Sequence, residues 1–106
     1  MSNLIAEVEK FSKSKPVVIF MKGSQDFPQC GFSARAIQVL KMAGAKEIAD
    51  FDVLSDDPMW GALEDFTKWP TVPQIFIGGQ FIGGCDIVTE MYERGELSEA
   101  IEKAGK

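Results

Sequence analysis

The stretch Pro16–Ala43, PVVIFMKGSQDFPQCGFSARAIQVLKMA, carries the features from which the fold can be predicted. Its first part, Val17–Met21, is a short, continuous run rich in β-branched residues, which is typical of a strand covered on both faces of a sheet. Its last part has apolar residues at helical spacing and is followed by Gly44, a common helix stop. We therefore predict a strand, a loop and a buried helix, with Cys30 at the entrance to that helix.

Cys30 begins the motif Cys30-Gly31-Phe32-Ser33. A thiolate at a helix N-terminus is stabilised by the free N–H groups and the helix dipole. A disulfide-exchange site on this frame would have a second cysteine where Ser33 stands, and a hydroxyl cannot resolve a mixed disulfide. The motif thus predicts one reactive thiol without a resolving partner. The alternative that Cys30 alone leaves open is a buried, inert cysteine, since free cysteines are among the most buried residues.

The whole chain has 106 residues and a net charge of -5, and no basic cluster. This charge argues against nucleic acid or an anionic membrane as the main partner, and no apolar run has the length of a membrane span. Two cysteines do not make a secreted disulfide scaffold, so we expect a reducing compartment. Residues 1–106 are expected to form one domain with its own core.

The first nine residues have neither the apolar run of a signal peptide nor the arginines of a transit peptide. We expect a cytoplasmic protein if the source is bacterial. If a transit peptide has been removed, the mitochondrial matrix or a plastid is expected instead.

Periodicity and turn residues predict the remaining elements. Asp57-Pro58 is expected to begin the third helix, Gly78-Gly79 to form a two-residue hairpin, and Asp86 to cap the fourth helix. The first two strands flank a helix, so they should be parallel through a right-handed crossover. This order predicts an α/β protein, a four-stranded mixed sheet with helices on both faces, which is the thioredoxin-like architecture. The predicted helices lie near residues 4–11, 31–43, 57–66, 86–94 and 97–103, and the predicted strands near 17–21, 48–53, 74–77 and 80–82.

Three separated segments, taken together, resemble a known family. They are Lys22-Gly23 with Pro28–Ser33, Trp69-Pro70-Thr71-Val72-Pro73-Gln74, and Gly83-Gly84-Cys85-Asp86. In this order they closely resemble the monothiol glutaredoxins of the Cys-Gly-Phe-Ser type, from about residue 11 to residue 97. The resemblance implies the glutaredoxin form of the thioredoxin-like fold and glutathione as ligand. It also implies the binding residues, which are Lys22, Cys30, Phe32, Thr71, Val72, Pro73, Gly84, Cys85 and Asp86.

The residues themselves suit such a ligand. The resemblance implies a cis bond before Pro73, which would leave the Val72 backbone free to pair with a peptide; the alternative is an ordinary trans turn proline. The helix that follows Gly84 can receive a carboxylate at its N-terminus, although Asp86 can also be a plain N-cap. Lys22 can stabilise a thiolate or bind a second carboxylate, or be only a solvated charge.

One feature departs from what the resemblance implies, and the length of one loop is informative. Members of the family usually have a basic residue on the helix before Trp69-Pro70 to hold the glycine carboxylate of glutathione, whereas this chain has Trp60 and Glu64 there. Lys68 is a candidate substitute. The loop Gly23–Gln29 is also longer than in dithiol glutaredoxins, which can open the sulfur to a metal.

Ligand counting indicates what the site does. A [2Fe–2S] cluster normally needs four thiolates. Cys30, the predicted catalytic nucleophile and metal ligand, together with one glutathione supplies two, so two chains complete the set. This predicts a cluster-bridged homodimer. A rival set, Cys30 and Cys85 from each chain, ranks lower, and a structural zinc site is improbable without histidine.

We therefore expect a carrier that delivers a glutathione-ligated [2Fe–2S] cluster to acceptor apoproteins, with at most weak enzyme activity. The first alternative is an oxidoreductase that removes glutathione from protein mixed disulfides, with Cys30 as the nucleophile. The second is an iron-sensing adaptor in which a BolA-like partner replaces one subunit.

Overall fold

The structure, a computed structural model, describes residues 2–105, and the elements follow the predicted order. The second predicted strand is shorter than expected, because the chain turns into a short 3-10 helix at Val53. The helices are α1 (Ser2–Ser12), α2 (Gly31–Met42), α3 (Asp57–Thr67), α4 (Cys85–Glu93) and α5 (Glu96–Lys103), and the 3-10 helix is η1 (Val53–Ser55). The strands are β1 (Val17–Met21), β2 (Ile48–Asp52), β3 (Gln74–Ile77) and β4 (Gln80–Gly83).

The four strands form one mixed sheet in the order β2-β1-β3-β4. β1 pairs with β2 in parallel and with β3 antiparallel, and β3 and β4 form the predicted hairpin. β1 is central, and all five of its residues are buried, as expected for a strand covered on both faces. The prediction of a four-stranded mixed sheet is confirmed.

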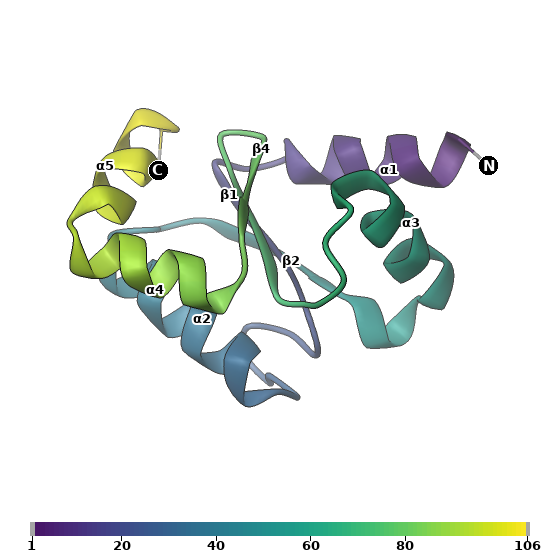
Figure 1. Ribbon diagram of the computed structural model, residues 1–106, viewed down its shortest axis with the longest axis horizontal. Coiled ribbons are helices and arrows are strands. Elements are labelled where there is room, and N and C mark those ends of the chain that lie inside the picture. Colours follow the sequence, from purple (N-terminus) through teal and green to yellow (C-terminus); the bar gives the residue numbers. More distant parts are fainter. Residues whose placement is uncertain (1, 106) are drawn as a thin grey trace.

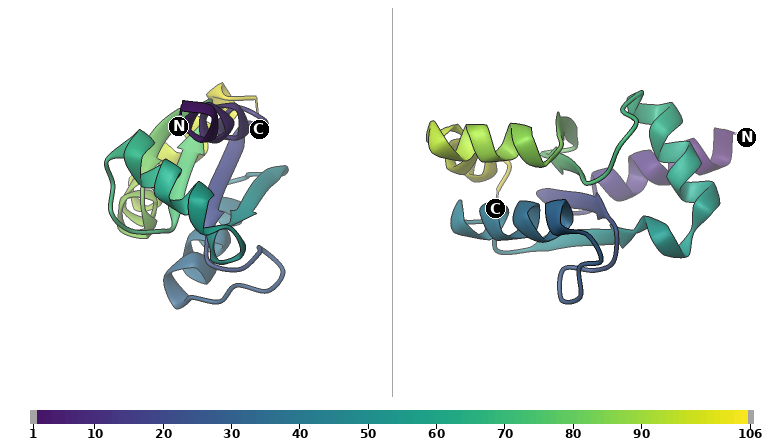
Figure 2. Two further views of the ribbon diagram at one scale, coloured as in Figure 1. Left: turned by 90° about the vertical axis from the view of Figure 1, so that its right-hand side faces the viewer. Right: turned by 60° about the horizontal axis from the view of Figure 1, so that its bottom comes forward.

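Helices cover both faces of the sheet (Figures 1 and 2). Because side chains alternate along a strand, Ile19 and Met21 point to the face covered by α2, α4 and α5. Val18 and Phe20 point to the opposite face, which α1 and α3 cover. Phe20 lies there among other aromatic rings, with Phe11 at a centroid distance of 5.4 Å. The two cores fix the helices relative to the carboxyl end of β1, where Lys22 follows.

Two helix starts differ from the prediction. The N-cap of α3 is Asp56, not Asp57, since the Asp56 side chain accepts a hydrogen bond from the backbone N–H of Met59. The N-cap of α4 is Gly84 in extended conformation, and Asp86 lies inside the first turn. Asp86 therefore does not cap this helix; its charge lies at the positive end of the helix dipole instead.

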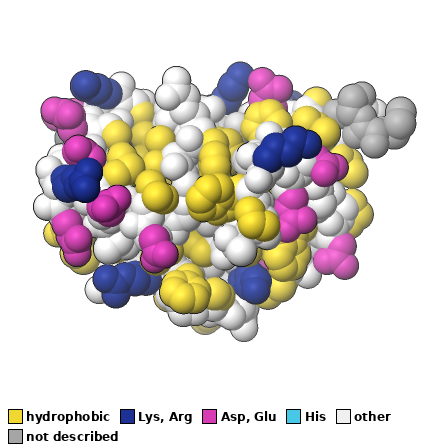
Figure 3. Space-filling model, in the orientation of Figure 1, with side chains coloured by type: hydrophobic (Ala, Val, Ile, Leu, Met, Phe, Trp, Pro, Cys, Tyr) yellow, Lys and Arg dark blue, Asp and Glu magenta, His cyan; other side chains and the backbone are white. Residues whose placement is uncertain are grey.

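The surface has a mixed character. Figure 3 shows hydrophobic side chains gathered across the middle of one face, between the two groups of helices, and acidic side chains over α4 and α5.

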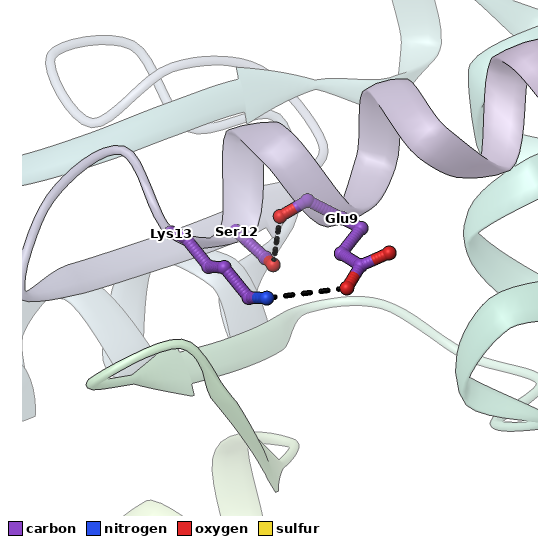
Figure 4. Close-up of polar contacts among 3 residues, drawn as sticks. All are labelled: Glu9, Ser12 and Lys13. Atoms are coloured by element: carbon purple, nitrogen blue, oxygen red, sulfur yellow. Dashed lines mark hydrogen bonds and ion pairs between the residues drawn. The ribbon is translucent and has the colours of Figure 1, made fainter.

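α1 ends at Ser12, before Pro16. In its last turn the Ser12 hydroxyl donates to the Glu9 carbonyl, and Lys13 pairs with the Glu9 carboxylate at 3.1 Å (Figure 4). Within residues 2–105, none of the helices combines the length and apolarity needed to cross a bilayer.

Candidate functional site

The three motif segments meet around one cavity of about 520 Å³. This volume lies in the range of about 300–1,000 Å³ that is typical of small-molecule sites. All nine residues predicted to bind the ligand line it: Lys22, Cys30, Phe32, Thr71, Val72, Pro73, Gly84, Cys85 and Asp86. The lining also includes Trp60, Trp69, Pro70 and Ile87. Sequence reasoning therefore identified the residues that share the cavity, although their individual roles remain predictions.

Cys30 lies at the N-cap of α2 in extended conformation and is half-buried. Its sulfur makes no capping hydrogen bond of ordinary geometry. The backbone N–H of Ser33 nevertheless lies close enough to favour the thiolate and is the largest cause of a lowered Cys30 pKa. Desolvation opposes this shift, while the N–H of Phe32, the charge of Lys22 and the Ser33 hydroxyl add to it. The helix entrance thus makes Cys30 a better nucleophile and metal ligand at neutral pH.

Ser33 is fully buried. Its hydroxyl oxygen accepts a hydrogen bond from the backbone N–H of Lys22, with an N–O distance of 3.3 Å. This bond joins the end of β1 to the first turn of α2. The residue that takes the place of a resolving thiol therefore also positions Lys22 and Cys30 relative to each other.

The opposite wall of the cavity is the segment Trp69–Pro73. The Val72–Pro73 bond is cis, as the resemblance implies. The side chain of Gln74 is fully buried and donates to the carbonyls of Trp69 and Thr71, at 2.9 and 3.0 Å. Gln74 therefore supports this segment from beneath, a role that the sequence analysis missed, because it placed the residue in the motif and at the start of a strand but assigned its side chain no contact.

Glycines allow α4 to approach this wall closely. A Cβ on Gly83, whose φ is +146°, would lie 2.8 Å from a side-chain carbon of Ile87, and one on Gly84 would lie 3.3 Å from the Pro73 carbonyl. Cys85 follows and is buried, with its sulfur 4.0 Å from the Thr89 hydroxyl. Cys30 and Cys85 are both free thiols and line the same cavity. Only Cys30 has the partial exposure that an incoming sulfur or iron would need.

The α3 side of the cavity is aromatic. The Lys22 ammonium lies 5.7 Å from the centroid of the Trp60 ring, within the range of a cation–π contact. The indole N–H of Trp60 is buried and has no acceptor among the described residues. Lys68 ends α3 in left-handed conformation, is exposed, and is not part of the cavity lining. The structure thus places no second cation from α3 in this wall.

The loop that carries Cys30 is fixed to the edge strand β2. The Asp52 carboxylate accepts from the backbone N–H of Gly23 at 2.9 Å and from that of Leu54 at 3.0 Å. The Asp50 carboxylate accepts from the backbone N–H of Gln25 at 2.8 Å. Sequence reasoning missed both carboxylates. The sequence pattern that could have indicated them is the spacing of two acidic residues at i and i+2, which places both on one face of an edge strand.

The cavity can supply a nucleophilic thiolate, a helix N-terminus for an anion, and an extended backbone segment. Across residues 2–105, no three His, Cys, Asp or Glu side chains are grouped so that they could hold a metal ion. A metal at Cys30 would therefore need ligands from outside the chain.

The sequence model of the glutaredoxin family matches residues 17–82, which span β1, the cysteine motif, α3 and the hairpin. The chain belongs to the glutaredoxin family. Its single Cys-Gly-Phe-Ser motif and its relatives place it among the monothiol members.

Curated relatives agree with this placement. This glutaredoxin is 45% identical over 97 residues to the chloroplastic monothiol glutaredoxin-S14 of Arabidopsis thaliana, covering 92% of this chain and 56% of that protein. It is 41% identical over 103 residues to glutaredoxin 4 of Escherichia coli K12, covering 97% and 89%. The chain spans only 56 to 63% of the length of the first three curated relatives, two chloroplastic and one mitochondrial.

Solved structures share the fold. The solution structure of reduced apo GrxS14 from poplar superposes with a TM-score of 0.84 at 42% identity, covering 99% of this chain and 98% of that one. A crystal structure of a buckwheat glutaredoxin–glutathione complex has a TM-score of 0.86 at 29% identity, with coverages of 98% and 92%. The fold predicted from the sequence, a glutaredoxin-type thioredoxin-like sheet, is therefore confirmed.

Proposed function

We propose that this monothiol glutaredoxin binds a [2Fe–2S] cluster as cargo at the interface of a homodimer and transfers it to acceptor apoproteins. The proposal rests on the residues at the first and last positions of the motif, where a dithiol site would have its two cysteines. Cys30 is a half-exposed thiol with a lowered pKa, and the place of a second thiol is taken by a buried hydroxyl at Ser33. Such a site favours holding a soft metal through one sulfur over closing a disulfide.

Glutathione is the proposed co-ligand. Its γ-glutamyl carboxylate would be held by the N–H groups at the start of α4, its cysteine backbone by Val72, and its glycine end would point toward Lys22. The thiol would then lie beside Cys30. Asp86, exposed in the first turn of α4, would take the γ-glutamyl ammonium.

The ligand count supports a dimer. One Cys30 and one glutathione per chain give two thiolates, and two chains give the four that a [2Fe–2S] cluster takes. Half of this set consists of a small, exchangeable thiol, which suits release to an acceptor protein. A BolA-like partner could replace one subunit by the same arithmetic. The proposal implies a reducing compartment, the bacterial cytoplasm, mitochondrial matrix or plastid.

The test is anaerobic reconstitution of the protein with iron and sulfide, with and without glutathione. We expect a glutathione-dependent cluster, two irons per dimer by iron counting, and a dimeric mass that returns to the apo value on chelation. Cys30→Ser should lose the cluster and keep the fold, and Cys85→Ser should keep both. A stable cluster in Cys30→Ser, or one that forms equally well without glutathione, would contradict the proposal.

The lowered pKa of Cys30 also favours a second candidate, a glutathione-dependent oxidoreductase. The Cys30 thiolate would attack the glutathione sulfur of a protein mixed disulfide and release the protein thiolate. A second glutathione thiolate would then attack the Cys30–glutathione disulfide, giving glutathione disulfide and free Cys30. We expect slow turnover beside a dithiol glutaredoxin at equal concentration, because Ser33 supplies no resolving thiol within the motif and the Gly23–Gln29 loop alters the pose of glutathione. Comparable rates would favour the enzyme over the carrier.

A further inference from the structure

The charges of the cavity are unevenly distributed. Among the described residues that line it, Lys22 is the only one with a cationic side chain, while Asp86 and the Cys30 thiolate are negative. A glutathione molecule brings two carboxylates and one ammonium. The free N–H groups of α4 can hold one carboxylate, so Lys22 alone remains for the other.

Lys22 is already engaged. Its ammonium rests on the face of Trp60, and a cation placed over an indole is stabilised there. A ligand carboxylate would draw Lys22 from the ring or share it. Trp60 thus covers the Lys22 charge with an aromatic face, and its indole N–H, which has no acceptor in residues 2–105, can donate to a carboxylate or to an amide carbonyl alike.

The next turn of α3 carries a negative charge. Glu64 follows Trp60 by four residues, so both lie on the same face of the helix. Glu64 is half-buried, and it takes part in no ion pair among the described side chains. Neither Glu64 nor Lys68, the nearest cation along the helix, lines the cavity, and Lys68 is exposed. The Glu64 charge therefore acts from one helical turn beyond the Trp60 wall, where it disfavours an anion and favours a cation.

We propose that Trp60 and Glu64 set the ligand specificity of this glutaredoxin, which accepts thiol tripeptides of the glutathione type whose C-terminal carboxylate is converted to an amide. An amide removes the charge that Glu64 repels, and an amide with a cationic amine adds a charge that Glu64 attracts. This inference rests on the proposed binding of glutathione at Cys30, and it names the class of ligand that the same site takes.

The test is a competition for Cys30 by thiol–disulfide exchange. The protein is equilibrated without oxygen with equal amounts of glutathione, its glycinamide analogue, and both corresponding disulfides. The Cys30 thiolate attacks either disulfide and releases one thiol, so the two mixed disulfides differ only at the C-terminus. Their ratio is measured by mass spectrometry of the Cys30 peptide. An unstructured peptide that contains Cys-Gly-Phe-Ser is the reference. It gives the ratio of the two mixed disulfides, and the fraction of cysteine that they occupy, when no cavity is present.

We expect the unmodified protein to form the mixed disulfide with the amide at least as readily as that with the acid, so the amide-to-acid ratio should be one or more. Glu64→Lys and Trp60→Arg should shift the ratio toward the acid by about three- to fivefold, the size of a partly exposed ion pair. Asp65→Lys is the matched control, since it makes the same charge change at an exposed residue on another face of α3. A cationic amide of glutathione made with a diamine should occupy Cys30 more than the glycinamide does, and this difference in occupancy should become smaller in high salt.

The outcomes separate the two proposals. A preference of the unmodified protein for the free acid, with an amide-to-acid ratio below one, overturns the inference and leaves glutathione binding intact. An equal shift in Glu64→Lys and Asp65→Lys, or none in either, also overturns it. An occupancy of Cys30 no higher than that of the unstructured peptide, for both thiols, counts against glutathione binding itself.

Discussion

The two walls of the cavity are held in different ways. The wall with Cys30 is a surface loop joined to the rest of the molecule by backbone N–H groups that donate to Asp50 and Asp52 on the edge strand. At its tip, Phe27 is 74% exposed. The wall with Pro73 lies on a fully buried Gln74, and its Pro73 carbonyl lies close to Gly84, the N-cap of α4.

The difference indicates where adaptation is tolerated. The Cys30 wall depends on a few polar contacts with the solvent-facing edge and on the turn at Gly23, so its exposed side chains can change while the core remains intact. The Pro73 wall is continuous with the core, so changes at its buried side chains should cost stability. The predictions below test this contrast, from the largest expected effect to the smallest.

The largest effect is expected where the Cys30 wall turns. Gly23 has a φ of +87°, and a Cβ there would overlap the Phe27 carbonyl and lie 2.7 Å from the Gln29 nitrogen. Gly44 also has positive φ, at +102°, but a Cβ there meets nothing within 4 Å. Gly44→Ala should cost about 1 kcal/mol of unfolding free energy, and Gly23→Ala about 3 kcal/mol, because overlap adds to strain. Urea denaturation measures both. Equal costs would mean that the loop rearranges freely.

The second prediction concerns the Pro73 wall. Gln74→Ala removes two hydrogen bonds to the carbonyls of Trp69 and Thr71 and leaves a small cavity. We expect a loss of about 2 kcal/mol of unfolding free energy. The matched control, Gln80→Ala, makes the same change at an exposed position of β4 and should cost little. Similar losses in the two variants would show that this support is not needed.

The third prediction separates charge from hydrogen bonding at Asp52. Asp52→Ala removes the acceptor of two backbone N–H groups and should cost about 1.5 kcal/mol, while Asp52→Asn keeps an acceptor oxygen and should cost less. Asp52→Ala should also change the rate of Cys30 alkylation, since Gly23 adjoins Lys22. If Asn and Ala have equal effects, the carboxylate acts through its charge alone.

The smallest effects are expected on the Cys30 pKa. The pKa is lowered chiefly by the backbone N–H of Ser33, which no side-chain substitution removes. Ser33→Ala and Lys22→Gln should therefore raise the pKa only modestly, as read from the pH dependence of alkylation. A return of the pKa to its ordinary value in Lys22→Gln would contradict this order of causes.

The lowered pKa of Cys30 also makes the unfolding free energy depend on pH. Between the lowered folded pKa and the ordinary unfolded pKa of Cys30, the unfolded chain binds more protons, so unfolding free energy rises with pH. This contribution is present above the unfolded pKa and is lost as the pH falls through the folded one. In Cys30→Ser this dependence should disappear from denaturation curves measured across that range.

Local sequence patterns determined much of this molecule. Continuous burial of Val17–Met21, helical periodicity after Cys30 and the Gly78-Gly79 turn each predict an element, because they act over a few neighbouring residues. The motif segments, through their resemblance to a family, identified the residues that line the cavity. The N-caps of α3 and α4 were predicted at Asp57 and Asp86 and lie at Asp56 and Gly84, because a residue type that favours a cap does not fix the residue at which the helix begins.

Only the tertiary structure decided which distant groups meet. The parallel register that pairs Met21 with Asp52 and Ile19 with Asp50 brings both carboxylates to the Cys30 loop, and α3 packing brings Trp60 under Lys22. These contacts join side chains to groups tens of residues away, so no local propensity encodes them. They follow from strand pairing and helix packing, which are set by the burial and hydrogen bonding of the whole chain and not by any one segment.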